Sequence, residues 1–207
     1  MNTLKDIKGI IFDYGGTIDT NSRHWAEVLW SKYVAHQVPV TKEAFREAYV
    51  LGERSLAKFP FVRPDHDFHD VLRIKCKLQM EYLAEKRHLP MDEAMLRNYA
   101  TLVADSCYDY VFDVLKVTRP VVDQLAKRYK LVLVSNFYGN IQTILKDFGL
   151  MDYFADIVES SVVGVRKPDP AIYQLGVDAM GYDAEQVLVV GDSFSKDMVP
   201  AKKVGCK

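Results

Sequence analysis

Four short segments of this chain place polar or charged side chains where a hydrophobic stretch ends. Taken singly, each is a weak signal, because an aspartate after a strand more often caps a helix and a Ser-Asn pair is usually a turn. Together they supply carboxylates, hydroxyls, an amide and lysines, and a carboxylate can act as a covalent nucleophile at neutral pH because it needs no deprotonation. The segments are FDYGGT at 12–17, VSN at 134–136, VRKPDPAIY at 165–173 and VGDSFSKD at 190–197.

The elements that must position these segments are β-rich runs alternating with helical ones. Alternating strands and helices predict βαβ units and a parallel sheet, and ligands bind at the carboxyl edge of such a sheet. The first strand ends at Asp13, where Gly15 and Gly16 break it. We therefore expect the four segments to meet at one edge. The predicted strands are 8–12, 130–136, 156–161 and 186–192, and the predicted helices are 119–129, 139–149 and 170–181.

The stretch from 21 to 115 differs from the rest, because it is helical in period, rich in aromatic residues and without a clear strand. We predict that it forms an all-helical cap, and that 1–20 and 116–207 form a Rossmann-like core. Asn21–Ser22 is a predicted helix N-cap at the entry. The return ends in Pro120, a residue suited to the first turn of a new helix. The segment 59–69 is expected to connect two cap helices.

In this order and at these strand ends, the four segments resemble the haloacid dehalogenase-like hydrolase superfamily over almost the whole chain. The insert corresponds to the helical cap that this family places after its first motif, the C1-type cap. The resemblance implies an α/β core with a cap, substrate bound between them, and Mg²⁺-dependent hydrolysis of a small phosphorylated metabolite.

The resemblance also assigns roles to single residues. Asp13 would attack phosphorus and form an aspartyl-phosphate, and Lys167 would neutralise charge between nucleophile and phosphate. Mg²⁺, whose hard character suits oxygen ligands, would be held by Asp13, Asp192 and the main-chain carbonyl of Gly15. Asp197 would be a second acid that steadies Lys167 or a metal-bound water.

Three further side chains are expected at the phosphate. Ser135, with Asn136 beside it, would hydrogen-bond a phosphoryl oxygen. Thr17 either donates to the phosphate or caps the following turn, and the sequence favours neither role. Phe137 and Tyr138 lie just past Ser135 and are expected near the site.

One position departs from the phosphatase pattern. Phosphatases of this family read Asp-x-Asp, and the second Asp serves as general acid and base. Gly15 occupies that position here, and general acid–base help is worth roughly 10²–10⁴ in rate. We therefore expect a slow or leaving-group-selective phosphatase. Asp19 is a candidate substitute acid, although capping or hinging the entry to the insert is its favoured role.

Two other branches and one other class remain open. Dehalogenases and phosphonoacetaldehyde hydrolases also lack the second Asp, and the latter use a cap lysine. Lys32, Lys42 and Lys58 are cap lysines that nothing in the sequence distinguishes from surface residues. A catalytically impaired phosphate-binding protein is the alternative of a different class, which the retained acidic and basic residues disfavour.

For two tryptophans and two histidines in the insert, the sequence favours a structural role over a functional one. Trp25 and Trp30 are expected mainly in the cap core, with lining of the pocket as the second possibility. His66 and His69 have spacing that permits a metal site with Asp65 and Asp70, but a solvated loop is the favoured interpretation.

The bulk composition excludes several classes. The 207 residues are 49% hydrophobic and 27% charged with a net charge of −1, and no basic block points to nucleic acid or an anionic membrane. No stretch approaches the roughly twenty apolar residues of a membrane helix, and the N-terminus does not resemble a signal peptide. We expect a cytoplasmic monomer or dimer with idle thiols at Cys76, Cys107 and Cys206. The family fold usually continues beyond Lys207, so we expect the sequence to be truncated.

Overall fold

The computed structural model describes residues 6–207, so residues 1–5 of the predicted core lie outside the described residues. Four parallel strands form one sheet in the order β3-β2-β1-β4. The register aligns Phe12 of β1 with Leu133 of β2 and Val190 of β4. The strands are β1 (Gly9–Phe12), β2 (Lys130–Ser135), β3 (Asp156–Glu159) and β4 (Val187–Val190).

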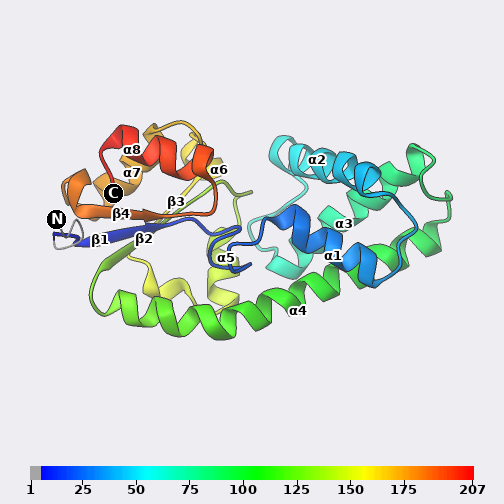
Figure 1. The fold of residues 1–207 in the computed structure, drawn as a ribbon, viewed down its shortest axis with the longest axis horizontal. Coiled ribbons are helices and arrows are strands. Elements are labelled where there is room, and N and C mark those ends of the chain that lie inside the picture. The colour runs from blue at the N-terminus through cyan, green and yellow to red at the C-terminus, as the bar shows by residue number, and fades with distance from the viewer. Residues whose placement is uncertain (1–5) are drawn as a thin grey trace.

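Helices cover both faces of the sheet, which explains why the strands are continuously hydrophobic (Figure 1). Ile10 and Phe12 point to the face that packs against α4 and α5, whereas Ile11 points to the face covered by α7 and α8. The predicted α/β fold is therefore confirmed. The core helices are α5 (Ile141–Asp147), α6 (Ser160–Val163), α7 (Ala171–Met180) and α8 (Val199–Val204), with short turns η1 (Met151–Tyr153), η2 (Ala184–Gln186) and η3 (Phe194–Met198).

The insertion between β1 and β2 is helical, as predicted, and it lies beside the carboxyl edge of the sheet (Figure 1). Thr41 caps α2 through its hydroxyl, and Asp67 and Asp70 form a reciprocal capping box at the start of α3. The predicted connection at 59–69 begins at Phe59, the C-cap of α2, and its last two residues lie in the first turn of α3. The cap helices are α1 (Trp25–Ala35), α2 (Lys42–Lys58), α3 (Phe68–Glu85) and α4 (Glu93–Ala126).

Helix α4 corrects the predicted return to the core. It runs without a break from the cap to the sheet, and Pro120 lies inside it rather than at the start of a new helix. Pro120 is exposed, so the backbone carbonyl that it leaves without an N–H partner can be hydrated. The proposed division at residue 116 thus falls within a helix, and the division itself remains a prediction.

Two smaller expectations were also wrong. The N-cap of α1 is His24, while Asn21 and Ser22 have φ values of 54° and 63°. That left-handed conformation belongs to a turn and differs from the extended backbone of an N-cap. The strand predicted at 156–161 ends at Glu159, because Ser160 begins α6.

β4 lies at one edge of the sheet, and the backbone of Lys207 forms hydrogen bonds with its outer side. Its N–H donates to Val187 and its carbonyl accepts from the N–H of Val189, at 3.0 and 2.8 Å. Among residues 6–207, none of the helices has the length and apolar character needed to cross a membrane.

Candidate active site

Asp13 lies directly after β1 and is almost fully buried, with 7% of its surface exposed. Its Oδ1 accepts a hydrogen bond from Lys167 Nζ at 2.6 Å, and Thr17 Oγ1 lies 3.4 Å from Oδ2. Burial raises the pKa of the Asp13 carboxyl to about 6, although the charge of Lys167 opposes that rise. Asp13 is thus a buried carboxyl group whose pKa Lys167 keeps below the value that burial alone would give.

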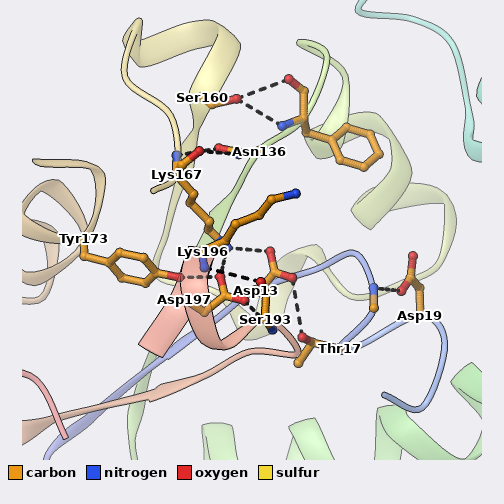
Figure 2. Close-up of polar contacts among 12 residues, drawn as sticks. Asp13, Thr17, Asp19, Asn136, Ser160, Lys167, Tyr173, Ser193, Lys196 and Asp197 are labelled. Atoms are coloured by element: carbon orange, nitrogen blue, oxygen red, sulfur yellow. Dashed lines mark hydrogen bonds and ion pairs between the residues drawn. The ribbon is translucent and has the colours of Figure 1, made fainter. Parts of the chain in front are cut away.

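Lys167 bridges two carboxylates (Figure 2). Its Nζ donates to Asp13 and, at 2.7 Å, to Oδ1 of Asp197. Asp197 is itself buried and fully engaged, because its Oδ2 accepts from the backbone N–H of Ser193 at 2.9 Å. The resulting Asp13–Lys167–Asp197 network joins the segments that follow β1 and β4 to the loop between α6 and α7.

Tyr173 extends this network, and the sequence analysis gave it no role. Its hydroxyl donates to Asp197 Oδ1 at 2.7 Å, and burial together with the Asp197 charge raises the Tyr173 pKa. The tyrosine therefore remains a protonated donor. It lies in the VRKPDPAIY segment, but nothing local connects it to Asp197, 24 residues away.

Asn136 uses both polar ends of its side chain on the backbone of Lys167. Oδ1 accepts from Lys167 N–H at 2.8 Å, and Nδ2 donates to the Lys167 carbonyl at 3.1 Å. These two bonds clamp the backbone of Lys167, and the predicted phosphate contact of Asn136 stays a prediction. Ser135 is buried at the end of β2 and lines the same cavity as Asp13.

Asp192 follows β4 and is exposed. Within residues 6–207, carboxylate oxygens of Asp13, Asp192 and Asp197 lie within 4.8 Å of one another. Burial, then the charge of Asp197, raises the pKa of Asp192. Lys167 offsets only part of the negative charge of these three carboxylates, and a divalent cation would offset more of it.

The donor set fits a magnesium ion, because carboxylate oxygens are the ligands that this ion prefers. The oxygens of Asp197 already accept from Lys167, Tyr173 and Ser193. Both oxygens of Asp13 also accept hydrogen bonds, whereas no described side chain donates to Asp192, which is therefore the least engaged of the three carboxylates. Gly15 lines the same cavity and can offer its carbonyl.

Asp19 does not reach the cavity. One oxygen accepts from the backbone N–H of Gly16 at 2.7 Å and the other from Trp25 Nε1 at 2.9 Å. Figure 2 shows its side chain set apart from Asp13. The structure thus favours the hinge role over that of a substitute acid. Burial raises the Asp19 pKa to about 7, against the two hydrogen bonds that lower it.

A cavity of about 860 Å³ opens between the edge of the sheet and the cap. Trp25, Phe137 and Tyr138 line it, whereas Trp30 packs against Phe45 inside the cap. Among the three cap lysines named from sequence, Lys58 lines it. The other two lie elsewhere, since Lys42 pairs with Glu27 and Lys32 lies over the Tyr110 ring.

The structure adds a cap lysine that the sequence analysis missed. Lys75 of α3 lines the cavity and is buried, with its Nζ 2.7 Å from Glu53 Oε1. A signal was present, because Lys75 falls on the same face of α3 as the apolar Phe68, Val71 and Leu72. A lysine in such a stripe is unusual and indicates a specific partner.

The histidine-rich segment forms no metal site. His69 pairs with Asp105 at 2.6 Å and stacks on Tyr108, while Asp70 belongs to the capping box of α3. His66 Nδ1 accepts from the backbone of Arg63. These side chains have different partners. His69 and Asp70 lie in helix α3 rather than in the solvated loop that the sequence favoured.

A Rossmann-like parallel sheet, a helical cap inserted after β1 and an acidic group at the sheet edge define a capped hydrolase core. The chain belongs to the haloacid dehalogenase-like hydrolases, and the family of that description matches residues 7–205. The mouse haloacid dehalogenase-like hydrolase domain-containing protein 3 is 32% identical over 209 residues, which cover 95% of this chain and 78% of that protein.

Other similarities are more partial. The zebrafish protein of the same name is 37% identical over 75 residues, or 36% of this chain and 31% of that protein. The 5-amino-6-(5-phospho-D-ribitylamino)uracil phosphatase YigB of Escherichia coli is 30% identical over 138 residues, which cover 67% of this chain and 56% of that protein. In these two matches the chain spans less than two thirds of the relative's length.

The fold is also that of a solved relative, the HAD-hydrolase YfnB of Bacillus subtilis, which was determined bound to magnesium and shows interdomain movement. The TM-score is 0.58 at 18% identity, covering 97% of this chain and 86% of that chain.

Proposed function

We propose that this protein is a magnesium-dependent phosphatase that hydrolyses a small phosphorylated metabolite through an aspartyl-phosphate on Asp13. The observation that carries the proposal is the buried Asp13–Lys167 pair, 2.6 Å apart, facing a cavity of about 860 Å³. The names of relatives such as the Escherichia coli phosphatase support the reaction class.

In the first step, an oxygen of Asp13 bonds to phosphorus and the ester P–O bond breaks. Lys167 lies beside the attacking carboxylate and offsets the negative charge that gathers there. Gly15 has no side chain to supply a proton, so the leaving oxygen takes its proton from water. Poor leaving groups should therefore depart slowly.

In the second step, water attacks phosphorus, the bond to Asp13 breaks and inorganic phosphate is released. The proton of the attacking water passes to solvent or to the phosphate. Ser135, which lines the cavity, and Thr17, which donates to Asp13, would contact the phosphoryl oxygens. Asp197 and Asn136 act through Lys167, the former on its amine and the latter on its backbone.

Magnesium held by Asp13, Asp192 and the Gly15 carbonyl would offset the repulsion between the carboxylate and the phosphate. The phosphonatase alternative gains no support from Lys75. Although burial lowers its pKa, the charge of Glu53 raises that pKa well above the ordinary value of a lysine. A protonated amine cannot attack a carbonyl to form a Schiff base.

The test is a panel of phosphate esters, acyl phosphates, phosphonoacetaldehyde and 2-haloacids, assayed with and without Mg²⁺. We expect Mg²⁺-dependent release of phosphate, fastest from aryl and acyl phosphates, and its loss in Asp13→Asn. Asp113→Asn is the matched control, because Asp113 is exposed on α4 and pairs with Lys116.

Two outcomes would contradict the proposal. Full activity in Asp13→Asn would show that Asp13 is not the nucleophile. Calorimetric binding of Mg²⁺ and phosphate without turnover of even an aryl phosphate would indicate the binding protein instead.

A further inference from the structure

An ion pair lines the cap side of the cavity, opposite the chemistry at the sheet edge. Lys75 on α3 and Glu53 on α2 approach to 2.7 Å, and their side chains are 9% and 34% exposed. Both residues line the cavity that also contains Asp13. A lysine is rarely buried unless it is paired, and the proposed phosphoryl transfer does not require either residue.

A residue of the core completes this group. Tyr138, just after β2, donates its hydroxyl to Glu53 Oε2 at 3.1 Å. The Lys75 amine also lies 5.8 Å from the centre of the Trp25 ring and 5.9 Å from that of Tyr138. Glu53, Lys75 and Tyr138 thus form a polar group flanked by aromatic faces, where the cap meets the core.

The chemistry of this group limits what it can bind. A lysine amine has three N–H donors, and Glu53 is its one ion-pair partner among residues 6–207. Glu53 Oε1 accepts no hydrogen bond from the described residues, so this carboxylate retains acceptor capacity beside its ion pair with Lys75 and its hydrogen bond from Tyr138. The pair is neutral as a unit and offers both donors and acceptors, so it suits a hydroxyl group, which accepts and donates at once. A carboxylate would find its attraction to Lys75 offset by repulsion from Glu53.

The cavity supports the same class of ligand by its size. Ligand pockets of roughly 300–1,000 Å³ enclose whole small molecules, and this one, at about 860 Å³, is far larger than a two-carbon acid needs. The carbon skeleton of a hydroxylated ligand can pack against Trp25, which lines the cavity.

We infer that the leaving group of the substrate is a polyhydroxy compound, so that the substrate is a sugar phosphate or polyol phosphate. Its hydroxyl groups bind between Lys75 and Glu53 while its phosphate lies at Asp13. This inference rests on the proposed phosphatase function and names the substrate class for the same site.

The test compares ribitol 5-phosphate and glucose 6-phosphate with phosphoglycolate and with p-nitrophenyl phosphate, which has no hydroxyl groups. The wild-type protein should prefer the polyol and sugar phosphates to phosphoglycolate. Glu53→Gln keeps the shape but leaves Lys75 with an uncompensated charge. It should lower kcat/KM for ribitol 5-phosphate by about tenfold or more, mainly through KM, and raise it for phosphoglycolate.

Lys75→Met should lower kcat/KM for the polyol phosphate without the gain on phosphoglycolate, because the positive charge is gone. The rate on p-nitrophenyl phosphate should change little in either variant. Glu47→Gln is the matched control, since Glu47 lies on the same helix but is exposed and accepts from Tyr82. This control should leave the ratios of kcat/KM between the substrates unchanged. Thermal unfolding checks that all variants fold.

Binding is measured separately from turnover, by calorimetry with ribitol 5-phosphate on Asp13→Asn and on Asp13→Asn combined with Glu53→Gln. Weaker binding in the second protein supports the inference. Equal binding, a wild-type preference for phosphoglycolate, or equal losses on all substrates in Glu53→Gln would overturn it. Absence of turnover on every ester, with the binding difference intact, would instead overturn only the phosphatase function.

Discussion

Gly16 and Asp192 approach each other so closely that a Cβ atom on Gly16 would lie 2.4 Å from Asp192 Oδ2. The two residues come from the loops after β1 and β4, and Gly16 has a φ of 94°. Both the contact and the backbone conformation therefore require glycine at this position. The backbone after β1 forms the surface against which the Asp192 carboxylate is held.

Gly16→Ala should displace Asp192 and weaken the metal site. We expect the Mg²⁺ concentration for half-maximal phosphatase activity to rise about tenfold, as when a group that orients a ligand is lost. Stability should also fall by about 1 kcal/mol because of the positive φ. Gly205→Ala is the control, with a φ of 104° but an ordinary 3.5 Å contact to Ala184. The Gly205→Ala variant should lose stability without a change in its Mg²⁺ dependence. An unchanged Mg²⁺ dependence in Gly16→Ala would show that Gly16 does not position Asp192 for the metal.

Gly15→Asp should restore a general acid. A Cβ atom there meets only Trp25, at 3.9 Å, so the side chain has room. We expect hydrolysis of alkyl phosphates to accelerate by about 10²-fold, with little change on p-nitrophenyl phosphate, because a good leaving group needs no proton. Gly15→Asn has the same shape without a transferable proton and should give no gain. Equal rates for the Asp and Asn variants would refute the missing-acid explanation.

Asn136→Ala should release the backbone of Lys167, since both hydrogen bonds of the clamp are lost. We expect kcat to fall by roughly 10-fold or more while KM changes little, because misplacing a group near the reacting atoms is costly. Steady-state kinetics on one ester separate the two parameters. A rise in KM at constant kcat would indicate that Asn136 contacts the substrate directly, as the sequence suggested.

Asp19 should make stability depend on pH. Its pKa is about 7 in the folded protein against an ordinary 3.8, so the folded state holds the proton more tightly. The stabilisation is therefore complete below pH 4 and is lost as pH rises towards 7, by on the order of 4 kcal/mol. Urea unfolding from pH 4 to 8 should show this loss for the wild type relative to Asp19→Asn.

The matched control for that comparison is Asp156→Asn, because Asp156 is an exposed aspartate at the start of β3. Its stability should follow the wild type at every pH. Parallel curves for the wild type and Asp19→Asn would mean that Asp19 does not titrate in this range.

The sequence by itself determined the strands, the helical insertion and the edge at which Asp13, Lys167, Asp192 and Asp197 meet. It could do so because buried parallel strands have a continuous hydrophobic pattern, and topology brings their carboxyl ends to one edge. The signals are local to each segment, and the sheet assembles them without further information.

Only the tertiary structure decided how side chains from different elements pair. Asn136 clamps Lys167 and Tyr173 binds Asp197 because loops after different strands pack together. Lys75 meets Glu53 because α2 and α3 are neighbours in the cap. Helix α4 continues through Pro120, which lies at an exposed position of that helix. Each outcome depends on burial and on partners far along the chain, which no local pattern encodes.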